Sequence, residues 1–328
     1  MDAALPQDLR RALDELAQGR SQRELARRAE AISQRYRGGE TSGAAVRDGD
    51  DALAYALTRM PATYAAASAA LAAVRNACAG FAPRTLVDAG AGPGTATFAA
   101  AEAFATLGTA LLIDDNPHLR ALGLTLAENA AATRTTAYLD GDVLSALAIA
   151  APADLVIASY VIGEVSPRSL GRVADALWEA TADMLVVIEP GTPAGFARIR
   201  TLRARLIAQG AHAIAPCPHD LPCPVVDPDW CHFSQRLPRS REHRQVKGAT
   251  LAFEDEKFAY VALARRRRPI TGARVLAHPR VGKVEVSAKL CTTHGIVTAT
   301  ASRRDRERYG TQKRWSWGDQ VAWPKPST

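Results

Sequence analysis

One stretch, LVDAGAGPGTATFAAAEAF at residues 86–104, restricts the possible fold more than any other part of the sequence. An apolar run ends at Asp88, and Gly90, Gly92 and Gly94 follow it directly before an Ala-rich segment of helical composition. Glycines in such a turn let the backbone approach a ligand closely, and the first turn of the helix offers free N–H donors. The stretch therefore predicts a strand, a ligand-binding turn and a helix, in that order.

The segments around this turn alternate between short apolar strands and Ala-rich helices. We expect five strands, at 85–90, 110–115, 136–142, 153–161 and 183–191, and an Arg-rich helix at 193–209. This alternation is typical of an α/β protein with a parallel, doubly wound sheet. Residues 249–266 are predicted to form two further strands that meet at a turn near Glu254–Lys257.

The two ends of the chain have different patterns. Residues 1–75 carry apolar side chains at helical spacing, with a loop at Gly38–Gly39 and a helix break or start at Pro61. After Pro269, alternating segments indicate a small antiparallel β unit. We therefore expect three parts: a helical region (1–78), a central domain (79–268) with a Cys-rich insertion at about 210–247, and a basic β extension (269–328).

Charge is distributed unevenly along the chain. From residue 232 to the end there are 21 Lys and Arg against 8 Asp and Glu, whereas the whole chain has a net charge of +7. Basic segments at 235–247, 264–269 and 302–323 interleave arginine with aromatic residues, a composition suited to phosphates and unpaired bases. RNA binding is therefore predicted, and the alternative is a solvated, basic sheet edge.

The composition also bears on location. No run of eighteen or more apolar residues indicates a membrane span, and the first twenty residues mix acids with arginines and lack an apolar core. The sequence is therefore predicted to be cytoplasmic. In that compartment clustered thiols hold metal more often than they form disulfides.

The spacing D-x-G-x-G-x-G resembles motif I of the class I S-adenosylmethionine (SAM) methyltransferases, in which this loop holds the methionine and ribose portion of the cofactor. Polar residues at the next three strand ends agree with this resemblance: a carboxylate for the ribose hydroxyls, one for the adenine amino group, and two residues beside the methyl group. These are Asp114, Asp142, Ser159 and Tyr160. With the loop residues Asp88, Gly90, Gly92 and Gly94, they are the predicted cofactor-binding set.

The methyl acceptor is less specified by the sequence. The Asn/Asp-Pro-Pro-Tyr tetrad of adenine-N6 methylases and a Pro-Cys nucleophile of a cytosine-C5 enzyme are not found at the expected places. Glu164 is a candidate general base, with a structural hydrogen bond as the alternative role. The sequence therefore predicts a SAM-dependent methyltransferase that has an RNA acceptor. The alternatives are a non-catalytic RNA-binding factor with a vestigial SAM pocket and a zinc-stabilised small-molecule methyltransferase.

Three cysteines lie within CPHDLPCPVVDPDWCHF, residues 217–233, and two more lie elsewhere in the chain. Cys217, Cys223 and Cys231 lack the Cys-x-x-Cys turn of most structural zinc sites, and prolines stiffen the loop. With Cys291 they make up four thiolates, which both zinc and an iron–sulfur cluster accept. A cluster, zinc and unligated cysteines therefore remain alternatives. Cys78 is assigned to the core.

The segments CPHDLPC…WCHFSQR, KGATLAFEDEKFAYVALAR and YALTRMPATYAA resemble the ribosomal small-subunit Rsm-type methyltransferase-like family. Eukaryotic members associate with the mitochondrial small ribosomal subunit and help to assemble it. The resemblance implies a [4Fe-4S] cluster on Cys217, Cys223, Cys231 and Cys291, and small-subunit rRNA as the partner. It also implies that Arg59 and Tyr64 border the SAM pocket.

Overall fold

The computed structural model of the chain describes residues 4–130, 135–239, 250–269 and 271–323. Four helices precede the first strand, as the helical spacing predicts: α1 (Gln7–Ala17), α2 (Gln22–Arg37), α3 (Ser42–Ala45) and α4 (Gly49–Ala77). Helix α2 begins where the Ser21 hydroxyl accepts the Glu24 N–H, and α4 begins where the Asp48 carboxylate accepts the Asp51 N–H. None of the helices in the described ranges is long and apolar enough to cross a bilayer.

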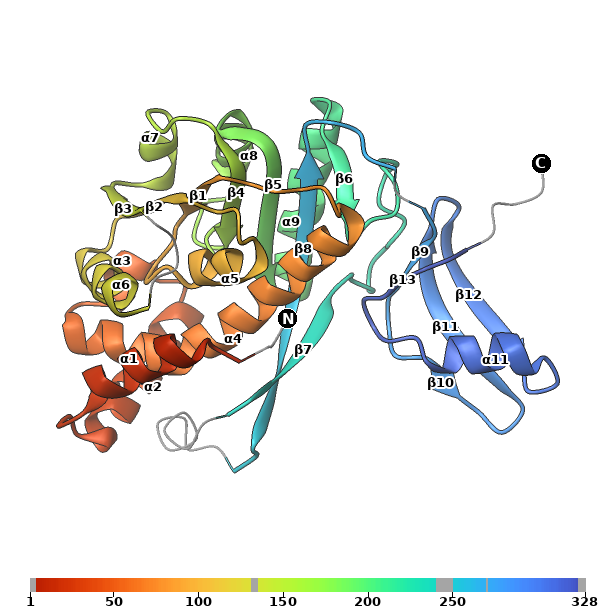
Figure 1. Cartoon of the computed structure of the whole chain (residues 1–328), viewed down its shortest axis with the longest axis horizontal. Helices are drawn as coiled ribbons and strands as arrows, with labels where there is room; N and C mark the ends of the chain where they lie inside the picture. Colours follow the sequence, from red (N-terminus) through yellow and green to blue (C-terminus); the bar gives the residue numbers. More distant parts are fainter. Residues whose placement is uncertain (1–3, 131–134, 240–249, 270, 324–328) are drawn as a thin grey trace.

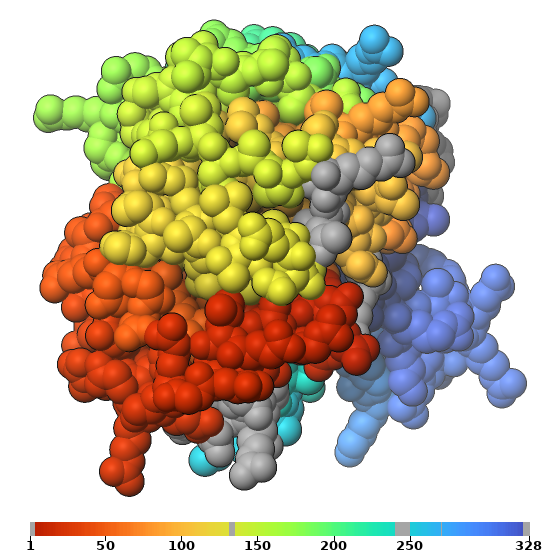
Figure 2. Space-filling model, turned by 60° about the vertical axis from the view of Figure 1, so that its left-hand side comes forward, coloured from red at the N-terminus to blue at the C-terminus, as the bar shows by residue number. Residues whose placement is uncertain are grey.

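Helix α4 continues through Pro61, where a break or a start was predicted. Buried residues lie all along this helix, and it packs against α5, α6 and strands on one face of the sheet. Packing around a buried helix of 29 residues outweighs the hydrogen bond that proline removes. The N-terminal helices are thus part of the main core, and Figure 2 shows them packed against the segment that contains α6.

The central sheet has the strand order β3-β2-β1-β4-β5-β8-β6, with β7 paired to β8. Its first five strands are parallel, and β8 is antiparallel to its neighbours. Their bounds are β1 (Thr85–Ala89), β2 (Thr109–Asp114), β3 (Thr135–Asp140), β4 (Ala153–Ser159), β5 (Thr181–Pro190), β6 (His212–Ala215), β7 (Phe233–Pro238) and β8 (Phe253–Ala264). This is the strand arrangement of class I SAM methyltransferases, so the predicted α/β doubly wound sheet is confirmed.

Helices connect the parallel strands and cover both faces of the sheet (Figure 1). They are α5 (Thr95–Ala103), α6 (Pro117–Asn129), α7 (Val143–Leu147), α8 (Leu170–Glu179) and α9 (Pro193–Ala208). Because the strands are buried on both faces, they read as nearly continuous apolar runs, which is why the sequence located them well.

Strand β8 differs from its prediction. It is one strand of 12 residues, and Glu254–Lys257 lies within it where a turn was expected. Exposure alternates along the first half of β8, which pairs with β7 as a two-stranded ribbon, while the second half is buried in the sheet. The polar stretch that was read as a turn is therefore the solvated part of a long strand. Figure 1 shows the ribbon leaving the sheet at the end where α1, α2 and α3 lie.

The C-terminal residues form a second, antiparallel sheet with a small core of its own. It contains β9 (Ala273–Val275), β10 (Arg280–Val281), β11 (Glu285–Thr292), β12 (Gly295–Ser302) and β13 (Gln320–Val321). Helix α11 (Arg306–Lys313), which the sequence did not predict, packs on β11 and β12. This C-terminal unit stands beside the main sheet in Figure 1, and the domain limits at 78 and 268 stay predictions.

Candidate functional site

A cavity of about 270 Å³ lies at the carboxyl ends of β1, β2 and β3. A doubly wound sheet binds ligands at this position, and the volume approaches that of small-molecule sites. Of the predicted cofactor residues, Gly90, Asp114 and Asp142 line the cavity, and the candidate base Glu164 lines it as well. The other predicted residues (Asp88, Gly92, Gly94, Ser159 and Tyr160) are not among the lining residues.

Asp114 is the central carboxylate of this cavity. Its Oδ2 accepts the Gly92 N–H at 2.7 Å and its Oδ1 accepts the Asn116 N–H at 2.9 Å. Burial raises the pKa of Asp114, although both N–H donors oppose the rise. Each carboxylate oxygen still has a free lone pair, so two ribose hydroxyls have acceptors here. Asp142 Oδ1 caps α7 by accepting the N–H groups of Leu144 and Ser145.

The glycine loop has the backbone that a close ligand contact requires. Gly90 has φ of 70°, and a Cβ at this position would lie 2.3 Å from a methyl carbon of Val161. Gly94 has φ of 82° and immediately precedes α5. Asp88 does not face the cavity: its side chain is fully buried and accepts the Thr97 hydroxyl hydrogen at 2.8 Å. Burial raises the pKa of Asp88 to about 7.

Residues before the first strand also line the cavity, and sequence reasoning missed them. The Ser42 N–H donates to Glu164 Oε2 at 2.7 Å, and the amide of Asn116 donates to the carbonyl oxygens of Ser42 and Val46. These bonds hold the short helix α3 across the cavity, with Thr41 and Ser42 in its wall. The glycine pair before α3 predicted a loop, but nothing in the sequence indicated that the residues after this loop line the cavity. Arg59 and Tyr64 do not line the cavity, and Tyr64 is fully buried.

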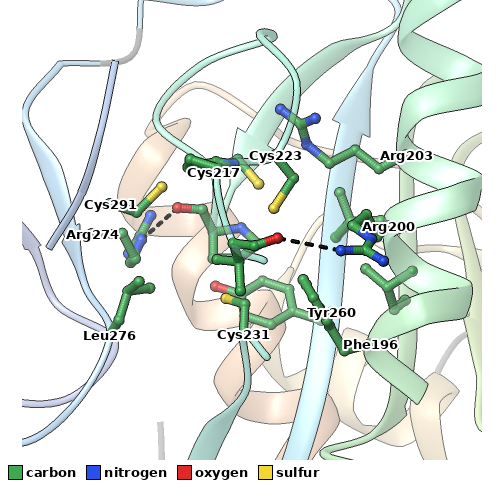
Figure 3. Close-up of a pocket in the computed structure, with 15 residues that line it drawn as sticks. Phe196, Arg200, Arg203, Cys217, Cys223, Cys231, Tyr260, Arg274, Leu276 and Cys291 are labelled. Carbon is green, nitrogen blue, oxygen red and sulfur yellow. Dashed lines mark hydrogen bonds between the residues drawn. The ribbon is translucent and has the colours of Figure 1, made fainter. Parts of the chain in front are cut away.

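The four candidate metal-ligating thiols lie around one pocket, although Cys291 is distant in sequence from the other three. Cys217, Cys223 and Cys231 come from the loop between β6 and β7, and Cys291 comes from β11. Figure 3 shows their side chains around the pocket. None of the four forms a disulfide, and Cys78 lies elsewhere at the end of α4.

The buried thiols are hard to ionise without a metal. Burial raises the pKa of Cys231 far above its ordinary value, and the neighbouring Cys217, Cys223 and Cys291 add to this rise. Burial likewise raises the pKa of Cys291 to about 12 and raises that of Cys223. His219 Nε2 lies 3.8 Å from Cys291 Sγ. A bound metal would lower these pKa values because thiolates are its ligands.

Three arginines line the same pocket, and none forms an ion pair with a carboxylate in the described parts of the chain. Arg203 NH2 donates to the His219 carbonyl at 2.6 Å, while its buried Nε has no described partner. Arg200 NH1 donates to the Val225 carbonyl at 3.3 Å, and Arg274 donates to two carbonyls. Arg203 and Arg274 are 3% and 4% exposed, so positive charge is buried beside the four thiols. This imbalance fits an anionic group in the pocket.

Although the four thiols line one pocket, no three His, Cys, Asp or Glu side chains in the described parts of the chain are grouped so that they could hold a metal ion. Zinc and a four-iron cluster both accept four thiolates.

Of the three predicted RNA-binding segments, residues 302–323 lie on the C-terminal unit. Arg304, Arg306, Lys313 and Arg314 lie in or beside α11, are exposed, and make no ion pair with a described residue. Arg265, by contrast, donates to the carbonyl oxygens of Trp178 in α8 and Thr181 in β5, and Arg268 pairs with Asp183 of β5. The segment 235–247 falls largely outside the described residues.

Comparison with known proteins identifies the family. The sequence model described as "Mitochondrial small ribosomal subunit Rsm22" matches residues 49–324, which is most of the chain. The chain belongs to the Rsm22 family. The resemblance found in the cysteine loop and in the β8 segment is thereby confirmed at the level of the family.

Two curated relatives agree with the Rsm22 assignment. The human "Ribosome assembly protein METTL17, mitochondrial" is 29% identical over 302 residues, which cover 84% of this chain and 63% of that protein. The "Rsm22-cox11 tandem protein 2, mitochondrial" of Schizosaccharomyces pombe is 28% identical over 223 residues, which cover 59% of this chain and 30% of that protein. The chain therefore spans less than two thirds of each relative.

Solved structures similar to this Rsm22-family chain include two methyltransferases. The magnesium protoporphyrin IX methyltransferase of Synechocystis, with bound SAH, gives a TM-score of 0.42 at 13% identity, covering 71% of this chain and 93% of that one. The precorrin-6Y C5,15-methyltransferase of Geobacter metallireducens gives a TM-score of 0.40 at 12% identity, covering 60% of this chain and 87% of that one.

The predicted cytoplasmic location is wrong. The family description and both curated relatives are mitochondrial, which contradicts it. The prediction relied on the composition of the first twenty residues, and this composition does not determine the compartment in which a folded domain works.

Proposed function

We propose that this chain is a SAM-binding, methyltransferase-like protein that binds small-subunit rRNA during assembly of the ribosome, in mitochondria. We further propose that Cys217, Cys223, Cys231 and Cys291 hold a [4Fe-4S] cluster. The observation that carries the proposal is the cavity at the ends of β1–β3, combined with four thiols and buried arginines beside the RNA-facing unit.

SAM binding is supported by the free acceptors of the cavity. Asp114 keeps one lone pair on each carboxylate oxygen, Asp142 lies in the cavity wall, and Gly90 leaves the backbone open to a ligand. When bound, SAM supplies an electrophilic methyl group. The chain's own contribution is to orient the cofactor and to exclude water, and α3 is tied across the cavity by Asn116 and Glu164.

The proposal of a cluster rather than zinc follows the family resemblance, since zinc and a cluster both accept four thiolates. With four thiolates either centre would be anionic, and the buried Arg203 and Arg274 supply positive charge without a carboxylate partner. All four thiols line one pocket.

The metal centre is also proposed to hold the RNA-facing unit in place. Cys291 and Arg274 belong to the C-terminal sheet, and both meet the cysteine loop. Lys289 of β11 forms an ion pair with Asp229 of the same loop. The unpaired cations of α11 would then face the RNA at a fixed angle to the SAM cavity. The ribosome-assembly name of the human relative agrees with this role.

A non-catalytic binding factor is the second candidate. The candidate base Glu164 already accepts the Ser42 N–H, and burial raises its pKa. A structural role for Glu164 would leave the site without a described general base, while SAM and RNA binding would persist.

The test begins with anaerobically purified protein. A broad visible absorption band with four irons and four sulfides per chain supports the cluster, and a colourless protein with one zinc refutes it. Cys231→Ser should lose the iron, whereas Cys78→Ser should keep it because Cys78 is remote from the pocket. Transfer of radiolabelled methyl groups from SAM to small-subunit precursors, compared with SAM binding by calorimetry, separates the two candidate functions.

A further inference from the structure

A groove of about 710 Å³ lies where the C-terminal unit meets the main domain, and we call it the junction groove. It is lined by the last part of α4, by paired residues of β7 and β8, and by the segment 317–322. In Figure 1, β7 and the C-terminal unit stand on either side of it. None of its lining residues also lines the SAM cavity, so the two are separate, and its volume is that of a small-ligand site.

The wall on α4 is a flat surface of small side chains. Ala69, Ala72, Ala73 and Ala77 recur at helical spacing, so they form one face of the helix, and all four are partly exposed. Asn76 lies on the same face, is exposed, and its amide makes no hydrogen bond to a described residue. A planar ligand can therefore approach this wall closely and meet one free amide.

The wall from the C-terminal unit carries an aromatic ring. Trp317 is half-buried, and its ring packs edge-to-face against His232 and His278, with centroids 4.8 and 5.7 Å away. These contacts fix the ring at the groove and leave part of it accessible. Gln320 lies further along the same wall, is exposed, and donates through its amide nitrogen to the Thr271 carbonyl at 2.8 Å. Its amide oxygen has no described donor.

The junction groove is polar but has no net charge. Among the described residues that line it, Arg274 and Asp319 are the charged ones, one of each sign. Arg274 already donates to two carbonyl oxygens, and Asp319 Oδ2 already accepts the Ser316 N–H at 2.7 Å. The remaining polar groups are neutral amides and hydroxyls, so the groove suits an uncharged ligand with a polar edge.

Positive charge lies directly beside this neutral groove. Lys313 and Arg314, at the end of α11, are exposed and form no ion pair with a described residue. Trp317 follows Arg314 by three residues, a stretch of chain that spans at most about 11 Å. A ligand that places a neutral group in the groove would therefore bring an attached anionic group within reach of these cations.

We propose that the junction groove binds an unpaired base of an RNA strand, between the alanine face of α4 and Trp317, while Lys313 and Arg314 bind the adjoining phosphates. This inference rests on the proposed RNA binding and names where a base is held. An unpaired base is planar and neutral with polar edges, which suits an accessible ring and the amides of Asn76 and Gln320. The unpaired cations beside the groove favour a polyanion over an extended peptide.

The first test uses the full-length protein and single-stranded RNAs of about twelve nucleotides, random in sequence, with one central 4-thiouridine. Irradiation links this base to residues that contact it, and mass spectrometry of the digested protein locates the link. The expected links fall within residues 69–77 or 317–322. Links confined to other segments overturn the inference.

The second test fills the groove from the α4 wall. Ala73→Phe should weaken binding of the same RNAs about 10-fold, which corresponds to the stacking energy of one base. Ala121→Phe is the matched control: Ala121 is exposed on α6, does not line the groove, and should leave the affinity unchanged. Fluorescence anisotropy measures both affinities. Unchanged far-ultraviolet circular dichroism and SAM binding show that the fold is intact.

The polar contact and the phosphate contact are tested separately. Asn76→Ala should weaken single-strand binding about 3-fold, through the loss of one hydrogen bond, and it decides the matter if Ala73→Phe disturbs the fold. Arg314→Gln should weaken binding of every RNA and reduce its dependence on salt, because it removes a phosphate contact.

The outcomes separate this inference from the proposed function. RNA affinity that neither Ala73→Phe nor Asn76→Ala reduces overturns the base site and leaves the groove to a protein partner, while RNA binding still stands. Binding of matching duplexes as tightly as single strands also overturns the inference, because a duplex keeps its bases stacked inside the helix. A wild type that binds no RNA overturns both.

Discussion

Arg274 of the C-terminal sheet donates through Nε to the carbonyl oxygen of Pro216, 2.7 Å away in the cysteine loop. Its NH1 donates to the Gly318 carbonyl at 2.8 Å, so one buried guanidinium joins three segments of the chain. The two sheets are thus connected by a cation beside the four thiols, and the stability of this junction is directly testable.

Arg274→Leu should reduce the free energy of unfolding by about 2–4 kcal/mol, because two charged hydrogen bonds are lost and two carbonyls lose their donor. The matched control is Arg280→Leu: Arg280 is exposed on β10 and should change stability by less than about 0.5 kcal/mol. Urea denaturation measures the free energy of unfolding of both variants. Equal effects would mean that Arg274 does not stabilise the junction.

Asp88→Asn should change how stability depends on pH. The pKa of Asp88 is about 7 in the folded protein and 3.8 for the free side chain, so the folded state binds its proton more tightly. The contribution of Asp88 is therefore fully present below about pH 4 and is lost as pH rises through about 7. The loss amounts to at most about 4 kcal/mol.

Unfolding of the wild type and of Asp88→Asn should be compared at pH 5 and pH 8. We expect the wild type to lose stability relative to the variant between these values. Glu189 also has its pKa raised to about 7, by burial, but it is the same in both proteins and cancels from the difference. A difference that is constant with pH would contradict the prediction.

Asp114→Asn should weaken SAM binding about 10- to 100-fold, because an amide cannot accept both ribose hydroxyls as a carboxylate does. Asp140→Asn is the control: Asp140 ends the neighbouring strand, is exposed, and pairs with Arg120 outside the cavity. Calorimetric titration with SAM gives both affinities. Similar affinities for the two variants would remove Asp114 from the cofactor site.

Arg203→Met should lower metal retention without destabilising the metal-free protein. Methionine has a similar length but no charge, so an anionic centre loses its counter-charge, while the metal-free fold is relieved of a buried unpaired cation. The control is Arg205→Met, two residues along α9, which removes an exposed ion pair with Asp175. It should change neither metal retention nor the stability of the metal-free protein. Iron analysis after dialysis and urea denaturation supply the two readouts. Iron retained as in the wild type would argue against an anionic centre.

The sequence predicted the parts of the molecule that local pattern determines. The buried parallel strands and the glycine turn follow from apolar runs and from backbone freedom. The polar half of β8 was misread because its partner β7 lies some twenty residues earlier, beyond any local pattern. Helix α11 has few apolar residues, so its helical periodicity was weak.

Site residues that depend on long-range packing were missed. Ser42 reaches Glu164 across more than a hundred residues, and the hydrogen bond uses a backbone N–H that carries no sequence signal. Arg203 was visible only as one of several arginines in α9, and nothing local marks it as the buried one.

The separation of Cys291 from the other three thiols would impose an order on maturation of the proposed metal centre. During synthesis the loop with Cys217, Cys223 and Cys231 is complete before β11 exists, so Cys291 is the last of the four thiols to be made. In the folded protein Cys291 lies in β11 opposite Arg274 of β9. A centre held by four thiolates would therefore be completed only when the C-terminal sheet forms, and chains that stop short of β11 would lack its fourth ligand.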